Sequence, residues 1–228
     1  MNLIQRIYMA GAGILALAAP LVADFNEAIR SYRPAEVQAV AAHTRNGSLD
    51  KNALDITLKA KNDRMYFSAG FPYIWIHKGN GQRRGVGDLS VSAGPWYQFG
   101  NNHLLPLATV QLPLGIDSAT DNPELELMLL GTNAYDPFGI DLGAGWRFRD
   151  GPDQRKLRLT TGASISDSWK LGLESVLSED DKLSTRQHFG LLRYTADGYH
   201  LTLYAGRTLN SPGPDAINFG GRLRVILD

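Results

Sequence analysis

Charged side chains recur at every second position within otherwise apolar segments of this chain. Alternate residues of a β-strand point to opposite faces, so such a segment has one apolar face and one charged face. Charges that line a pore set its ion preference, whereas charges inside a small barrel can also pair across strands and fill the interior. Both interpretations are open for the candidate interior residues, which carry both signs of charge: Lys59, Asp88, Asp141, Arg147, Arg158, Lys170, Glu174, Tyr204, Arg222 and Arg224.

The histidines are the other candidates for chemistry. His188 lies near Ser184 and Glu179, and a serine and a histidine held by a third group perform nucleophilic ester hydrolysis. The five histidines show no metal-site spacing. Exposed loop positions account for them more simply, so we predict no catalytic residue, no metal site and no cofactor.

Composition and one glycine motif exclude further classes. The 228-residue chain has no cysteine and a formal net charge of zero, and no basic run suggests nucleic-acid binding. Gly85-Val86-Gly87-Asp88 is followed by a long alternating segment, whereas a phosphate-binding loop leads into a helix. We therefore predict that Asp88 and these glycines shape the edge of a sheet.

The N-terminus predicts export. Arg6 precedes the apolar stretch Ile7–Val22, which Pro20 interrupts and which is short for a membrane span. We predict a signal peptide at residues 1–23, cleaved before Asp24. Residues 24–35 would form a periplasmic segment or a small plug, and residues 36–228 would form one domain.

Period-two alternation indicates an all-β domain of long strands. In the clearest case, Phe138, Ile140, Leu142, Ala144, Trp146 and Phe148 alternate with Gly139, Asp141, Gly143, Gly145, Arg147 and Arg149. Several such runs reach the ~9–11 residues that cross a bilayer at a tilt. Twelve strands are predicted, at 36–45, 53–61, 64–76, 86–99, 104–116, 124–131, 138–149, 157–166, 168–178, 188–196, 199–207 and 217–227. The first could instead be a short helix after Pro34, which leaves ten strands as the alternative.

Together with this alternation, two further features predict a closed antiparallel transmembrane β-barrel. Tight joins such as Asn62-Asp63 and Asp197-Gly198 alternate with longer ones such as His77–Gly85, with Gly131–Pro137 as a somewhat long inner turn. Short periplasmic turns and longer outer loops are typical of bacterial barrels. Aromatic residues, among them Trp169, Phe189 and Phe219, fall near the strand ends on the apolar face. Since lipid tolerates no unpaired sheet edge, residues 217–227 should pair with 36–45.

Short motifs on these strands resemble the outer-membrane proteins of the phenol-degradation meta-pathway transporter family. They are Phe71-Pro72-Tyr73, Gly85–Leu89, Leu112-Pro113-Leu114-Gly115 in a strand, and Leu130-Gly131-Thr132. Leu114 stands where that family more often has Thr. The resemblance implies a barrel that passes small, often hydrophobic or aromatic compounds.

The sequence thus predicts a bacterial outer-membrane barrel for passive passage of a small solute. The expected partners are outer-membrane lipid, the solute and the barrel assembly machinery, with no nucleic acid, and the barrel is expected to be a monomer. Two alternatives stay open: a lipid-modifying enzyme of the outer membrane, and a structural or adhesive barrel without transport.

Overall fold

The computed structural model describes residues 35–47, 49–79, 81–116, 122–135, 138–181, 183–211 and 214–227. The predicted signal peptide and all but the last residue of the predicted periplasmic segment lie outside these ranges. All regular elements described are strands: β1 (Ala35–Asn46), β2 (Leu49–Lys61), β3 (Met65–Lys78), β4 (Gly81–Val86), β5 (Leu89–Pro95), β6 (Tyr97–Phe99), β7 (Asn102–Leu112), β8 (Glu124–Tyr135), β9 (Phe138–Phe148), β10 (Gln154–Ser164), β11 (Trp169–Glu179), β12 (Ser184–Ala196), β13 (Tyr199–Ser211) and β14 (Ala216–Leu227). Among the described residues, no helix is long and apolar enough to cross a membrane.

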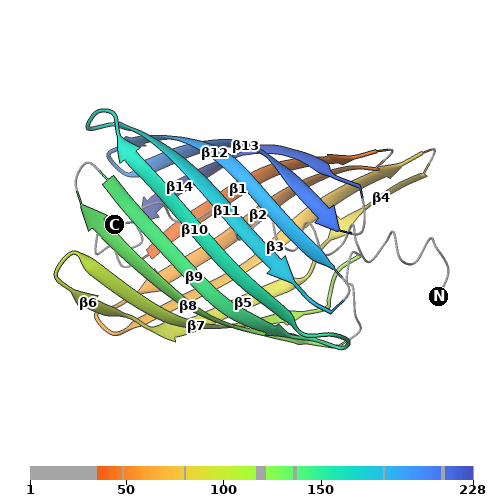
Figure 1. Cartoon of the computed structure of the whole chain (residues 1–228), viewed down its shortest axis with the longest axis horizontal. Helices are drawn as coiled ribbons and strands as arrows, with labels where there is room; N and C mark the ends of the chain where they lie inside the picture. The colour runs from red at the N-terminus through yellow and green to blue at the C-terminus, as the bar shows by residue number, and fades with distance from the viewer. Residues whose placement is uncertain are drawn as a thin grey trace.

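The strands form one closed antiparallel barrel (Figure 1). β1 pairs with β14 from Ala35↔Leu227 to Arg45↔Ile217, and the β2–β3 pairing completes the ring. β4, β5 and β6 are consecutive pieces of one wall strand, so the wall has the twelve strands predicted. β1 is a strand and not a helix, and the predicted pairing of the last segment with the first is confirmed.

We call the end of the barrel where β1 begins and β14 ends the terminal end, and the opposite end the distal end. Two predicted connections were wrong because strand pairing extends further than the apolar alternation does. β3 and β4 are separated by only two residues after Lys78, so His77–Gly85 is not a long loop. β8 continues to Tyr135, through most of the predicted inner turn. One predicted strand was too long: β7 ends at Leu112 and not at residue 116, so the Leu-Pro-Leu-Gly motif lies mostly beyond the strand.

The exterior and interior of the wall alternate residue by residue, as predicted. Leu142, Leu173 and Phe219 are among the many large apolar side chains that are exposed on the outside. Buried residues that face inside are largely polar. Phe189 is the exception among the predicted exterior aromatic residues: it is buried, and its ring meets Tyr204 edge-on at 6.0 Å. Phe189 and Leu191 face inward while Gly190 and Leu192 face outward, so both faces of this segment are apolar and alternation could not assign them.

Asp88 and its glycines occupy a β-bulge. β3 pairs Tyr73 with Val86 and Gly70 with Ser90, so two residues of β3 oppose three of the neighbouring strand. The Asp88 carboxylate accepts hydrogen bonds from Gly115 N at 3.2 Å and Gln111 Nε2 at 3.3 Å. A Cβ on Gly115 would lie 2.3 Å from the backbone of Gly87. The motif therefore holds the segment after β7 against a bulge within the wall, and not at the edge of the sheet as predicted.

Candidate functional site in the barrel interior

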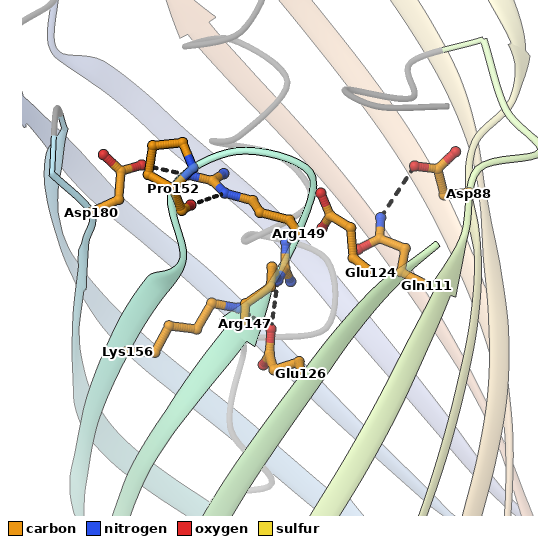
Figure 2. A network of polar contacts seen from close by, with 9 residues as sticks. All are labelled: Asp88, Gln111, Glu124, Glu126, Arg147, Arg149, Pro152, Lys156 and Asp180. Atoms are coloured by element: carbon orange, nitrogen blue, oxygen red, sulfur yellow. Dashed lines mark hydrogen bonds and ion pairs between the residues drawn. The ribbon is translucent and has the colours of Figure 1, made fainter. Parts of the chain in front are cut away.

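A group of four charged residues at the distal end forms a compact network, which we call the distal charge cluster: Glu124, Glu126, Arg147 and Lys156 (Figure 2). Arg147 Nε donates to Glu126 Oε2 at 2.8 Å, and its Nη1 lies 3.5 Å from Glu124 Oε2. Lys156 Nζ lies 2.5 Å from the same Glu126 oxygen. The strands β8, β9 and β10 bring these groups together because Glu126 pairs with Arg147, which pairs with Gln154. Two carboxylates thus offset two buried cations.

A second network beside this cluster fastens a distal connection. Arg149 Nε donates to the carbonyl of Pro152 at 2.8 Å, and its guanidinium forms an ion pair with Asp180 (Figure 2). Pro152 precedes β10 and Asp180 follows β11, so one arginine ties two connections at the rim. Both networks connect neighbouring strands and support the structural interpretation of the charges at this end.

Four arginines extend from mid-barrel toward the terminal end, on β10, β12 and β14, and we call them the interior basic group: Arg158, Arg193, Arg222 and Arg224. Arg193 and Arg222 are buried, each with only 2% of its surface exposed. Arg193 Nε donates to Thr202 Oγ1 at 3.1 Å, and Arg193 pairs with Thr202, which pairs with Arg222. Three of these side chains therefore lie within electrostatic reach of one another around Arg222.

Two carboxylates contact the interior basic group. Glu174 Oε2 lies 3.4 Å from Arg158 Nη2 and accepts a 3.2 Å hydrogen bond from Thr160. Glu36 lies 3.4 Å from Arg224 Nε and 3.2 Å from Lys59 Nζ. Asp55 also lies within electrostatic reach of Arg222 and Lys59.

All ten predicted interior residues lie at inward-facing positions of the wall or, for Asp88, at the bulge. Lys59 also donates to Gln38 Oε1 at 2.8 Å, and the Tyr204 hydroxyl donates to the Ala41 carbonyl at 3.4 Å. Asp141 pairs in register with Thr160, and Lys170 pairs with Arg193. The structure therefore separates the candidates, placing Arg147 in the distal charge cluster and Arg158, Arg222 and Arg224 in the interior basic group. Their role toward a solute stays a prediction.

Sequence reasoning missed an apolar part of the interior, which we call the interior apolar patch: Leu105, Leu107, Met128 and Leu130. Leu105 pairs with Leu130 and Leu107 with Met128, in register with the inward pair Thr109 and Glu126. A Cβ on Gly143 would lie 2.9 Å from Leu130 Cδ2, so the glycine leaves room for this side chain. Leu104, Leu105 and Leu107 form an apolar run in which no alternation indicates the inward face. At the terminal end of the patch, Trp96 stacks on His103 with ring centroids 5.2 Å apart.

The interior apolar patch lies across the barrel from Arg222 and Arg224 of the interior basic group, whereas Arg158 on β10 adjoins it beside Gly143. β8 and β14 are six steps apart in the twelve-strand ring, so they lie on opposite sides of the barrel. Leu130 on β8 and Arg222 on β14 are both near the middle of their strands. Leu130 and Arg222 therefore lie on opposite walls at similar depth. A second apolar cluster, formed by Val40, Ala42, Phe189, Leu191 and Tyr204, lies beside Arg222, since Val40 pairs with Arg222.

The predicted partner of His188 is corrected by the structure. Its Nδ1 lies 3.0 Å from the hydroxyl of Ser175 on β11, and not against Ser184, because Ser175 pairs with His188 in the β11–β12 register. Both side chains face the exterior. In the described part of the chain no carboxylate hydrogen-bonds to His188, and no group of three His, Cys, Asp or Glu side chains is arranged to hold a metal ion.

The fold is similar to that of several solved outer-membrane barrels. The translocator domain of the autotransporter NalP from Neisseria meningitidis aligns with a TM-score of 0.65 and 11% identity, over 98% of this chain and 97% of that one. A NanC porin aligns with a TM-score of 0.63 and 5% identity, over 84% and 100%. A KdgM porin in complex with disordered oligogalacturonate aligns with a TM-score of 0.61 and 14% identity, over 84% and 99%. No family model and no curated protein matches the sequence.

Proposed function

We propose that this chain is an outer-membrane barrel through which a small solute passes passively, and that the preferred solute has an apolar body and an acidic group. The observation that carries this proposal is that the interior apolar patch lies across the barrel from Arg222 and Arg224 of the interior basic group. Twelve strands enclose a narrow interior, so a solute within it contacts both sides at once.

Each side of the interior contributes a different interaction. A carboxylate gains charge-assisted hydrogen bonds from Arg193 and Arg222, and these bonds are strong because the guanidiniums are shielded from water. The apolar body of the solute gains by leaving water for the surface of Leu130 and Met128. A solute with only an acidic group or only an apolar body would make only one of these two interactions and would bind more weakly.

The fold similarity supports a channel and its location. Two of the similar structures are porins, and one of these contains oligogalacturonate, an anionic sugar chain. Both termini of bacterial outer-membrane barrels lie on the periplasmic side. We therefore infer that the terminal end faces the periplasm and the distal end faces the outside of the cell. The sequence resemblance to the phenol-degradation family is compatible with the apolar side of the interior.

The channel is tested in planar lipid bilayers with the purified barrel. In a KCl gradient we expect steady conductance with a reversal potential that favours anions, because the four arginines of the interior basic group line the path of the ion. Benzoate should reduce the current at concentrations about tenfold lower than benzyl alcohol or acetate. In Arg222→Gln, benzoate should no longer block the current at lower concentrations than benzyl alcohol does. In Leu130→Asn, it should no longer block at lower concentrations than acetate does.

Arg84 provides a matched control, because it is exposed on β4 and its neighbour in the ladder is the outward residue Trp75. Arg84→Gln should leave conductance and benzoate block unchanged. A silent bilayer with barrels that are demonstrably folded would contradict the channel. Conductance blocked equally by all three compounds would leave the channel standing and reject the acidic, apolar solute.

Ester hydrolysis is a second candidate function, which the Ser175–His188 contact favours. No carboxylate orients His188 among the described residues, so we expect the pair to satisfy each other's polar atoms in an apolar setting rather than to catalyse. Incubation of the folded barrel with phospholipid vesicles should release no fatty acid above the level of the His188→Ala variant. Release that disappears in that variant would instead identify an enzyme.

A further inference from the structure

The exterior of the barrel carries a groove of about 900 Å³ across β9 to β13. Its walls are large apolar side chains, including Ile140, Leu171 and Leu173. Because these side chains face outward on a transmembrane wall, the groove opens toward lipid and not toward the interior.

Small residues on neighbouring strands make the groove. Thr161 pairs with Leu173, Leu173 with Gly190, and Gly190 with Ala205, so two of the smallest side chains lie in one row. A Cβ on Gly190 would have the Ala205 carbonyl as its nearest neighbour, at 3.9 Å. The backbone around Gly190 therefore has room for a larger side chain. Because glycine has none, this part of the groove stays open.

Polar and basic side chains adjoin the distal end of the groove. The next outward row toward the distal end contains Ser175, His188 and Arg207, and the row after it contains Arg186. Arg186 and His188 are exposed, and Arg207 is 64% exposed while it shares an ion pair of 2.6 Å with Asp215. Cations on the lipid-facing side of a barrel are tolerated near the membrane interface, where lipid headgroups lie. An apolar groove therefore continues into a basic rim along the same strands.

We propose that this surface binds a phosphorylated glycolipid of the outer leaflet, with its acyl chains in the groove and its phosphate at Arg186, Arg207 and His188. The complementarity has two parts, since an acyl chain buries apolar surface against Gly190 and Leu173 and the phosphate accepts charge-assisted hydrogen bonds from the arginines. The choice of leaflet rests on the orientation proposed above, which places the distal end at the exterior. The binding chemistry itself does not depend on conduction.

Native mass spectrometry of the folded full-length barrel in detergent micelles tests this proposal with three added lipids: diphosphoryl lipid A, the same lipid without phosphate, and phosphatidylglycerol. We expect diphosphoryl lipid A to bind about tenfold more tightly than either other lipid. The Arg186→Gln/Arg207→Gln variant should lose this preference, and Gly190→Leu should weaken binding of all three by filling the groove. Arg84→Gln, which changes an exposed cation on the opposite side of the barrel, should bind as the parent does.

Equal binding of diphosphoryl and phosphate-free lipid A would overturn the proposal, and so would equal binding of phosphatidylglycerol. If Arg84→Gln loses the preference for diphosphoryl lipid A as fully as the double variant does, the lipid adsorbs nonspecifically and the site is rejected. If Gly190→Leu does not fold, the double arginine variant decides the result alone. A silent barrel that still shows the expected lipid preference would contradict the channel only, whereas a conducting barrel without that preference would contradict the lipid site only.

Discussion

Glu126→Leu is expected to destabilise the barrel by about 3–5 kcal/mol, because removing one partner of a buried ion pair leaves its opposite charge uncompensated. Glu126 Oε2 accepts from Arg147 Nε at 2.8 Å and lies 2.5 Å from Lys156 Nζ, so this one carboxylate contacts both buried cations of the cluster. The Lys156 side chain is only 2% exposed and has little access to water. Urea unfolding of the barrel in lipid vesicles, followed by tryptophan fluorescence, measures the loss.

Two further variants separate loss of charge compensation from loss of a side chain. Arg45→Gln removes a cation whose side chain is 68% exposed and whose nearest carboxylate, on Asp50, is 3.8 Å away. Exposed pairs contribute about 0–1 kcal/mol, so this change should be nearly neutral. Replacing the whole cluster, Glu124, Glu126, Arg147 and Lys156, by Leu, Leu, Met and Met should recover much of the stability lost by Glu126→Leu alone, because no charge of the cluster is then left unpaired. A single variant as stable as the parent, or a fourfold variant worse than the single one, would show that the distal charge cluster does not act as a charge-compensating unit.

The architecture could be predicted because lipid imposes two simple requirements. Outward positions must be apolar, which produces the alternation seen in β9 and β14, and no edge may stay unpaired, which requires β1 to meet β14. The predicted ends of the strands were less accurate. Hairpins such as β3–β4 extend beyond the apolar band, where polar residues on both faces hide the period. Tyr135 and Lys78 therefore lie in strands that alternation alone ends too early.

The candidate interior could be predicted by position but not by partnership. The alternation of apolar and polar positions along each strand is enough to place Arg147, Arg222 and Lys59 on the interior face. It cannot show that Lys156, predicted to lie in a connection, shares Glu126 with Arg147, because this depends on the register of three strands. The interior apolar patch was invisible for another reason: Leu104 and Leu105 are adjacent and alike, so only the structure shows that Leu105 faces inward. Long-range contacts such as Thr44 with Asn218, at 2.8 Å across the closure, likewise need the register.

Gly94→Ala is expected to prevent the barrel from folding or to lower its stability by several kcal/mol. A Cβ on this glycine would lie 1.9 Å from the carbonyl oxygen of Pro106 and 3.1 Å from Leu107 Cα. Both are backbone atoms of β7 that no rotamer change can move, so β5 and β7 would have to separate. Overpacking alone typically costs about 1–3 kcal/mol, and here the strain falls on the ladder itself.

The close approach at Gly94 has a cause in the partner strand. The β5–β7 ladder is continuous from Leu89↔Leu112 to Ala93↔Ala108 and resumes in β6 at Tyr97↔Leu104. Pro106 lies opposite the gap and has no N–H to donate, so the two backbones can approach more closely there than in a regular ladder. Trp96 N donates instead to the Arg64 carbonyl at 2.9 Å, which keeps the wall joined to the β2–β3 turn.

Gly131→Ala on β8 provides the matched control, since the nearest atoms to its added Cβ are 4.0 Å away. Heat-modifiable migration in gels reports folding of both variants, and urea unfolding in vesicles reports stability. We expect Gly131→Ala to migrate and unfold as the parent does, while Gly94→Ala migrates as an unfolded chain or unfolds at much lower urea. If Gly94→Ala instead folds with parent-like stability, β5 and β7 are not held as closely as described, and the side of the wall that carries Trp96 and the interior apolar patch can yield to a solute.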